Sequence, residues 1–175
     1  MISEDKIIQG CIENDRYSQE LLFKKYRGKM FGICLRYAKT KDEAEDVLVE
    51  AFLSIFTKIK DFRNECNIEL WIRRIVINTA INNYRKNLKH YYHGEVENYY
   101  NNTDLQTEIT DNMSVEDILK LVQDLPTGYR TVFNMYAIEG YSHQEIAETL
   151  GISEGTSKSQ LFKARKLLQS KLKKN

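Results

Sequence analysis

The sequence contains few residues that interrupt helices. It has one proline and eight glycines among 175 residues. Proline ends a helix and glycine weakens one, so their scarcity allows long helices. Alternation of apolar and polar residues, the usual mark of a half-buried strand, is absent as well. Apolar residues instead recur at helical spacing. We therefore predict an all-α protein.

Metal ligands and activated nucleophiles are also scarce. The three cysteines and three histidines lie apart in the sequence and lack the spacing of a zinc site. There is no glycine loop of the kind that holds phosphates, no carboxylate pair in an apolar setting, and no nucleophile with a recognisable base. We predict that the chain is not an enzyme and has no metal site, no cofactor and no small-molecule substrate.

A signal peptide and an apolar run long enough to span a membrane are missing too. The cytoplasm is therefore the expected compartment, and we expect no membrane insertion. The composition, with 42% apolar and 29% charged residues, is that of an ordinary soluble protein. Because the net charge is only +1, charge alone does not identify a nucleic-acid partner.

The most informative segment is 141–168, which reads YSHQEIAETLGISEGTSKSQLFKARKLL. Ser142 and Glu145 form a capping box at the start of a short helix, and Gly151 permits a turn after it. Ser153 is the expected N-cap of a second helix. The inner stripe of that second helix consists of Leu161, Ala164 and Leu168.

The outer faces of this second helix are basic. From Lys158 to the C-terminus there are seven lysines or arginines and no acidic residue. This pattern favours a helix-turn-helix whose second helix enters a DNA groove over a hairpin whose charges only keep it soluble. The residues expected to contact DNA bases and phosphates are Lys158, Ser159, Phe162, Lys163, Arg165 and Lys166.

The segment from Leu125 to about Leu172 resembles region 4 of bacterial RNA polymerase sigma factors, which binds the −35 promoter element. The same pattern occurs in other helix-turn-helix regulators, so it indicates DNA binding more firmly than sigma activity. Two positions depart from the family. Ser157 stands where an apolar residue is usual, so we expect looser packing there. Gln160 stands where a basic residue is common, so we expect one phosphate contact to be missing.

A helix over 40–59 carries two apolar rows. The first, at Ala44, Val47, Leu48, Ala51, Ile55 and Ile59, is expected to be core. The second, at Val49, Leu53 and Phe56, lies beside acidic residues. Either this helix is buried nearly all round, or the second row is a protein-binding surface with a polar edge. The stretch resembles sigma region 2.2, which binds the clamp helices of the largest polymerase subunit. The resemblance assigns core polymerase binding to Asp46, Val49, Glu50 and Leu53.

The following segment, FRNECNIELWIRRIVINTAINNYRKNLK, combines a polar loop with a basic helix. Trp71, Ile72, Ile75 and Thr79 are expected to face inward, and Trp71 is interpreted as mainly structural. The loop is either an ordinary connector or a pocket for an unpaired base. The segment resembles sigma regions 2.3 and 2.4, which open and read the −10 element. The resemblance assigns DNA contacts to Arg63, Asn64, Glu65, Cys66 and Asn67 in the loop and to Arg74, Asn78, Arg85 and Lys86 in the helix.

As a whole the chain resembles a minimal sigma factor of the extracytoplasmic-function (ECF) group. We predict a region 2 helical bundle over residues 1–88, a flexible linker over 89–113, and a region 4 helix-turn-helix domain over 114–175. The resemblance implies two partners, core RNA polymerase and promoter DNA, and control by an anti-sigma factor. The alternative is a helix-turn-helix regulator whose helical N-terminal domain senses a signal or dimerises.

Overall fold

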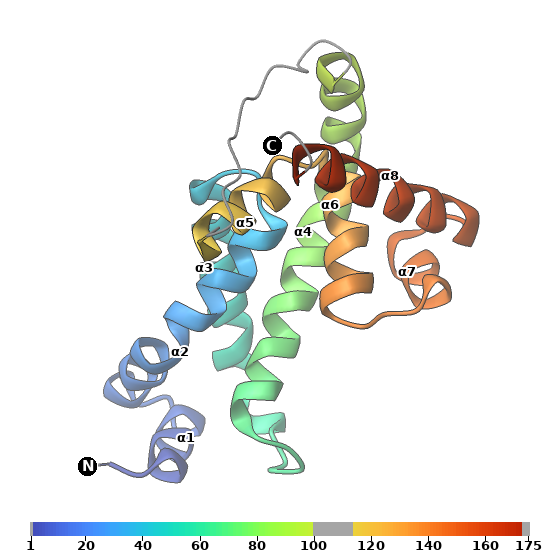
Figure 1. Cartoon of the computed structure of the whole chain (residues 1–175). Coiled ribbons are helices and arrows are strands. Elements are labelled where there is room, and N and C mark those ends of the chain that lie inside the picture. Colours follow the sequence, from blue (N-terminus) through green and yellow to red (C-terminus); the bar gives the residue numbers. More distant parts are fainter. Residues whose placement is uncertain (1, 100–113, 173–175) are drawn as a thin grey trace. The chain divides into compact units, whose positions relative to one another are not determined.

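The computed structural model describes residues 2–99 and 114–172, with side chains up to Leu88 and again from Ser114. These residues form helices and their connections, and no strand occurs among them, which confirms the predicted all-α class. The elements, shown in Figure 1, are α1 (Glu4–Ile12), α2 (Arg16–Tyr37), α3 (Lys41–Lys58), the turn η1 (Ile59–Asp61), α4 (Ile68–Tyr99), α5 (Val115–Gln123), α6 (Thr127–Phe133), the π-helical turn η2 (Asn134–Ile138), α7 (His143–Leu150) and α8 (Glu154–Leu172).

The chain divides into two compact units. The first contains residues 1–35 and 41–80, and the second contains residues 36–40 and 81–175. Helix α4 continues to Tyr99, so residues 89–99 of the predicted linker are helical. The remainder of that predicted linker, 100–113, lies outside the described residues. The predicted domain boundaries therefore stay a prediction.

In the first unit, α3 packs through the face that the sequence predicts. All six residues of its first apolar row are buried, and Ala44, Ala51 and Ile55 have no exposed surface. Phe52 extends this face, and its ring contacts that of Phe23 in α2 edge-on, with 4.8 Å between the centroids. Burial of a side chain of this size contributes about 1.5–3 kcal/mol. This row therefore holds α3 against its neighbours in the bundle.

Helix α4 begins beside this core and buries one side. Ile68, Ile72 and Val76, spaced by four residues, are 3%, 0% and 0% exposed. Thr79 is also buried, as predicted, and its hydroxyl donates to the Ile75 carbonyl at 2.9 Å. Trp71 and Ile75 are only half-buried. The inward prediction was therefore right for Ile72 and Thr79 and only partly right for the other two.

The second unit is organised around the turn between α5 and α6. Arg130 is 1% exposed, and its guanidinium donates to the carbonyls of Gln123 and Leu125 at 2.7 and 3.1 Å. These charge-assisted bonds satisfy carbonyls at the C-terminal end of α5, where they are otherwise left without helical partners. Leu121, Val132, Met135, Ile146 and Leu161 form the apolar core around which α5 to α8 pack.

The three cysteines lie in different surroundings. Cys11 and Cys34 are buried in helices, whereas Cys66 is exposed on the loop before α4. Burial raises the pKa of the Cys11 thiol to about 11 and that of Cys34 to about 12, because a thiolate is poorly solvated inside a protein. In the described part of the chain, no cluster of histidine, cysteine and acidic residues has the form of a metal site, and no helix is long and apolar enough to cross a membrane.

We expect one thiol of the native protein to react rapidly with a disulfide reagent such as DTNB at neutral pH. That thiol is Cys66, because Cys11 and Cys34 are both inaccessible and poor in thiolate. Mass spectrometry of the labelled protein identifies the site, and a Cys66→Ser variant serves as the control. Rapid labelling of Cys11 or Cys34 in that variant, without unfolding, would contradict the packing described above.

Candidate DNA and protein interfaces

One face of α3 is exposed and carries the four residues assigned to polymerase binding. Asp46, Val49, Glu50 and Leu53 are all exposed, and their spacing places them on one side of the helix, opposite the buried row. Val49 is 56% exposed and Leu53 64%. Phe56, at the end of the second apolar row, is half-buried and contacts Phe52. The helix is therefore not buried all round, and it presents two large apolar side chains between carboxylates.

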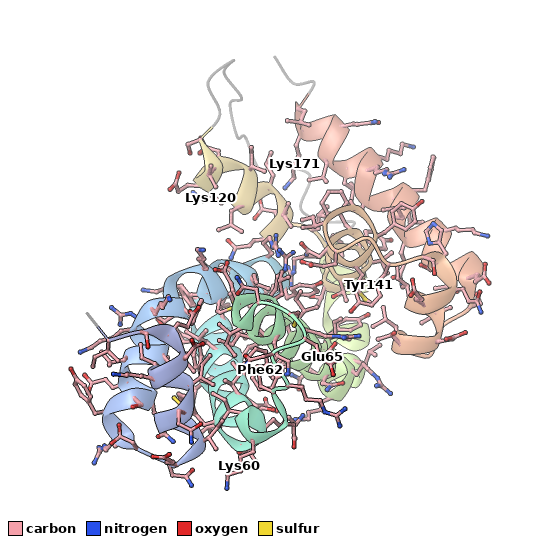
Figure 2. The ribbon with its side chains drawn as sticks, turned by 90° about the horizontal axis from the view of Figure 1, so that it is seen from below. Lys60, Phe62, Glu65, Lys120, Tyr141 and Lys171 are labelled. Carbon is pink, nitrogen blue, oxygen red and sulfur yellow. The ribbon has the colours of Figure 1, made fainter. Side chains whose placement is uncertain are left out.

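The loop between η1 and α4 contains the five predicted DNA-binding residues Arg63, Asn64, Glu65, Cys66 and Asn67. All five are exposed. Figure 2 labels Phe62 and Glu65 on this segment and Lys60 in η1, which precedes it. Asn64 has a positive φ of 55°, a conformation that asparagine adopts more readily than most residues. The ring of Phe62 lies against that of Trp71, with 5.5 Å between the centroids, which ties the beginning of the loop to α4.

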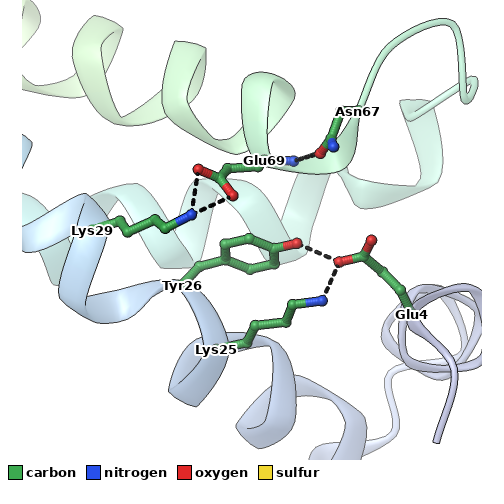
Figure 3. A network of polar contacts seen from close by, with 6 residues as sticks. All are labelled: Glu4, Lys25, Tyr26, Lys29, Asn67 and Glu69. Carbon is green, nitrogen blue, oxygen red and sulfur yellow. Dashed lines mark hydrogen bonds and ion pairs between the residues drawn. The ribbon is translucent and has the colours of Figure 1, made fainter.

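The end of the loop is held by a polar network that the sequence did not predict (Figure 3). The Asn67 side chain accepts a hydrogen bond from the Glu69 N–H at 2.7 Å and so caps α4. The Glu69 carboxylate in turn pairs with Lys29 of α2 at 2.9 Å. The contact joins residues 40 positions apart, so no local sequence signal indicates it.

A second group of polar contacts, also drawn in Figure 3, joins α2 to the N-terminal helix. Glu4 of α1 accepts hydrogen bonds from Lys25, at 2.6 Å, and from the Tyr26 hydroxyl of α2. These bonds, that from Lys25 first, lower the pKa of the Glu4 carboxyl because they favour its ionised form. Burial and the nearby Glu4 carboxylate raise the pKa of Tyr26. Helix α1 also contacts η1 directly, so it supports the start of the loop.

The outward side of α4 is polar and basic. Arg74, Asn78, Arg85 and Lys86, which are assigned to DNA, are all exposed, and Asn82 is exposed among them. Among the α4 side chains that the structure describes, Glu69 is the one acidic group, and it is paired with Lys29. Guanidinium and amide groups in such a row suit phosphates and base edges.

In the second unit, the predicted capping chemistry is present at both helices of the hairpin. Ser142 accepts from the Glu145 N–H at 3.2 Å, and the Glu145 carboxylate accepts from the Ser142 N–H at 2.8 Å. Gly151 follows α7 with a positive φ of 69°, the left-handed conformation typical of a helix end. The Ser153 hydroxyl accepts from the Thr156 N–H at 3.0 Å and caps α8.

The outer faces of α8 carry the predicted DNA-contacting residues. Lys158, Ser159, Phe162, Lys163, Arg165 and Lys166 are all exposed, and Phe162 is 68% exposed. The inner stripe is buried at Leu161 and Ala164 and half-buried at Leu168. Such a division between a packed side and a basic side is what a recognition helix requires.

Three of these basic side chains contact other residues of the second unit. Lys163 lies over the Tyr129 ring, 5.9 Å from its centroid, and Arg165 lies over Tyr136 at 5.7 Å. Lys158 pairs with Glu154 at 3.4 Å. An exposed pair of this kind contributes only about 0.2–1 kcal/mol. The pair therefore holds the Lys158 side chain only weakly.

The two positions that depart from the family both face other elements of the second unit. Ser157 has no exposed surface, and its hydroxyl lies 2.9 Å from Nδ1 of His143, so the polar group on the inner stripe has a partner. The His143 ring is stacked on Tyr136, with 4.4 Å between the centroids. The half-buried Gln160 lies beside Gly128 of α6, away from the exposed basic row. The expectations of looser packing at Ser157 and of a missing phosphate contact at Gln160 both stay predictions.

Two short capped helices joined by a glycine turn, with a basic exposed side on the second, define a helix-turn-helix DNA-binding domain. Here it is linked to a helical bundle that presents an apolar and acidic face on α3 and a basic row on α4.

Comparison with known proteins agrees with this class. The family models for Sigma-70 region 2 and Sigma-70, region 4 match residues 22–89 and 115–168. The ECF RNA polymerase sigma factor SigW of Bacillus subtilis is 30% identical over 85% of each chain. The ECF RNA polymerase sigma-E factor of Haemophilus influenzae is 26% identical over 98% of this chain and 96% of its own.

Among solved structures, the sigma factor RpoE from Bartonella quintana, determined in complex with the anti-sigma factor NepR, shares the fold. Its TM-score is 0.51 at 19% identity, over 89% of this chain and 97% of that one. The chain belongs to the ECF group of RNA polymerase sigma factors.

We expect the Ser142→Ala variant to weaken α7 by about 1 kcal/mol, because it removes the N-cap hydroxyl. Amide hydrogen exchange in α7, measured on the full chain by mass spectrometry, should accelerate about fivefold. Ser170→Ala is the matched control. The Ser170 hydroxyl bonds to the Leu167 carbonyl near the end of α8, and its removal should leave α7 unchanged.

The difference in the stability of α7 between wild type and Ser142→Ala should depend on pH. Hydrogen bonds from the Ser142 N–H and hydroxyl lower the pKa of the Glu145 carboxyl, so their contribution is present above the ordinary glutamate pKa. This contribution to stability is lost as the pH falls through the lowered pKa of Glu145. Between neutral pH and about pH 3, the difference in the stability of α7 between wild type and Ser142→Ala should become smaller. It should not vanish, because the Ser142 hydroxyl also accepts from a backbone N–H that does not titrate. A gap that widens on acidification would contradict the capping geometry.

Proposed function

We propose that this chain directs core RNA polymerase to promoters, binds their −35 and −10 elements, and promotes DNA melting there. The observation that carries the proposal is the presence, on one chain, of three exposed surfaces with separate chemistry. They are the apolar and acidic face of α3 around Leu53, the loop and basic row at α4, and the basic side of α8. The match to sigma regions 2 and 4 supports the same division of labour.

The α3 face suits a protein partner. Val49 and Leu53 are large apolar side chains exposed side by side, and Asp46 and Glu50 flank them. Apolar anchors surrounded by charges are typical of the centre and rim of a protein interface. In the proposed assembly this face binds the clamp helices of the largest polymerase subunit. An anti-sigma factor that covers this face would prevent binding to core RNA polymerase. The Bartonella quintana sigma factor was solved in complex with an anti-sigma factor, which supports such a partner here.

The loop and α4 suit DNA that is being opened. Removing a base from the stack costs a few kcal/mol, and the cost is recovered when a pocket traps the unpaired base. The exposed loop residues supply amides, a guanidinium and a carboxylate for base edges, while Arg74 and Asn78 lie on the adjoining helix. Melting by this route uses binding energy and needs no covalent chemistry from the chain.

The helix-turn-helix regulator with a sensing or dimerising N-terminal domain is the less favoured function. Residues 22–89 match sigma region 2, which such a regulator has no reason to contain. Footprinting separates the two functions, because a dimeric regulator protects symmetric half-sites about one helical turn apart, whereas a sigma factor protects two dissimilar elements.

The direct test is run-off transcription with purified core RNA polymerase. We expect a promoter-dependent product with the wild-type chain, and at least about tenfold weaker binding to core enzyme for Leu53→Asp, because a buried carboxylate without a partner opposes the interface. Tyr17→Asp is the matched control. Tyr17 is 59% exposed on α2 and belongs to none of the three surfaces.

The expected result is that Tyr17→Asp binds core enzyme like the wild type. No promoter-dependent product from the wild-type chain, together with no binding to core enzyme, would refute the proposed function. If both aspartate variants weaken binding to core enzyme equally, the α3 face is not part of the interface, and the rest of the proposed function is unaffected.

A further inference from the structure

His143, the first residue of α7, contacts two other elements of the second unit. Its Nδ1 lies 2.9 Å from the Ser157 hydroxyl of α8. Its ring is stacked on that of Tyr136 in η2, with 4.4 Å between the centroids and 21° between the planes. The Arg165 guanidinium of α8 lies over the same tyrosine ring, 5.7 Å from its centroid. His143 is therefore connected to α8 at two points, directly at Ser157 and through Tyr136 at Arg165.

The first of these connections fixes the orientation of the His143 ring. Ser157 has no exposed surface, and a hydroxyl buried away from water is costly without a hydrogen-bond partner. His143 supplies that partner. A rotation of the imidazole would break this bond and separate the ring from Tyr136. The hydrogen bond and the ring contact together therefore hold the imidazole in one orientation.

The second connection starts from a fixed piece of backbone. Tyr136 lies in the π-helical turn η2, where its neighbours Asn134 and Met135 have no exposed surface. Turns of this kind are frequent at functional sites. The Tyr136 ring itself is half-buried, whereas Arg165 is exposed. A guanidinium over a tyrosine ring is attracted to it without using its N–H donors. The contact therefore restrains the Arg165 side chain and leaves those donors available.

We propose that His143 is a positioning residue for binding of the −35 element. It supports the Tyr136 ring, and this ring holds the Arg165 guanidinium in the orientation in which it binds a DNA phosphate. The inference rests on the proposed function and adds to it a residue that acts through another. A long arginine side chain loses rotamer freedom when it binds, and one that is already restrained loses less. His143 thereby raises the affinity for the promoter through Arg165.

Lys163 provides an internal comparison on the same helix. It is also exposed and also lies over a tyrosine ring, that of Tyr129, 5.9 Å from the centroid. Tyr129 belongs to α6, whereas His143 is stacked on Tyr136 of η2. A positioning role for His143 therefore predicts energetic coupling of His143 with Arg165 and none with Lys163.

The test is a double-mutant cycle on promoter binding by holoenzyme, assembled from core RNA polymerase and the full chain. We expect His143→Ala to weaken binding about fivefold, because Arg165 must then be ordered when it binds. In an Arg165→Ala background the same substitution should weaken binding less than about twofold, because the group that it positions is gone. In a Lys163→Ala background its effect should again be about fivefold.

A conservative pair of substitutions keeps the ring contact without the hydrogen bond. His143→Phe together with Ser157→Ala leaves an aromatic ring against Tyr136 and no buried hydroxyl without a partner, so the cost in stability is small. We expect this double variant to bind promoter DNA within about twofold of the wild type. Thermal unfolding of each variant shows that it is folded at the temperature of the binding measurement.

An equal loss from His143→Ala in the wild-type, Arg165→Ala and Lys163→Ala backgrounds would overturn the inference and indicate a general support of the helix-turn-helix. Unchanged binding by His143→Ala would overturn it as well. So would an Arg165→Ala variant whose binding keeps the full salt dependence, since the loss of one phosphate contact should reduce the slope of log K against log salt by about 0.9. Failure of the proposed function is distinguishable from these results, because holoenzyme with the wild-type chain would then show no promoter-specific binding.

Discussion

The functional surfaces of the first unit depend on the burial of one side of α4 and one side of α3. Ile68, Ile72 and Val76 fill the core at intervals of one helical turn, and this packing turns Arg74 and Asn78 outward. In α3 the buried row that includes Ala44 and Ile55 likewise turns Val49 and Leu53 outward. These two helices therefore display the residues assigned to them, and the loop 63–67 displays the others of the first unit. The same helices that build the core also carry residues assigned to DNA and to polymerase.

Much of this architecture was predictable because its signals are local. Helical spacing of apolar residues identified the buried row of α3, and the pairing of Ser142 with Glu145 marked the start of α7. Ser153 and Gly151 marked the turn of the helix-turn-helix in the same way. Capping bonds join residues three positions apart, so the sequence contains both partners side by side. The exposure of the site residues assigned on α3, α4 and α8 follows from the same periodicity, whereas that of residues 63–67 comes from their place in a loop.

What the sequence could not supply are contacts between residues distant in the chain. The pairing of Lys29 with Glu69 and the hydrogen bond between His143 and Ser157 depend on how helices pack, so their residue types alone do not indicate them. Helix α4 also runs to Tyr99, beyond the expected start of a linker at 89. Residues 89–99 lack an apolar period and include Gly94, so their residue types alone do not indicate this extension.

We infer that the outward side of α4 faces promoter DNA in the transcription complex. It is tested most directly by placing a photocrosslinking amino acid at position 74 or 78, in place of Arg74 or Asn78, and irradiating the complex with core RNA polymerase and promoter. We predict crosslinks to the −10 region from both positions, and none from a probe in place of Lys24, an exposed residue of α2. Crosslinks from positions 74 and 78 to polymerase subunits alone would contradict it.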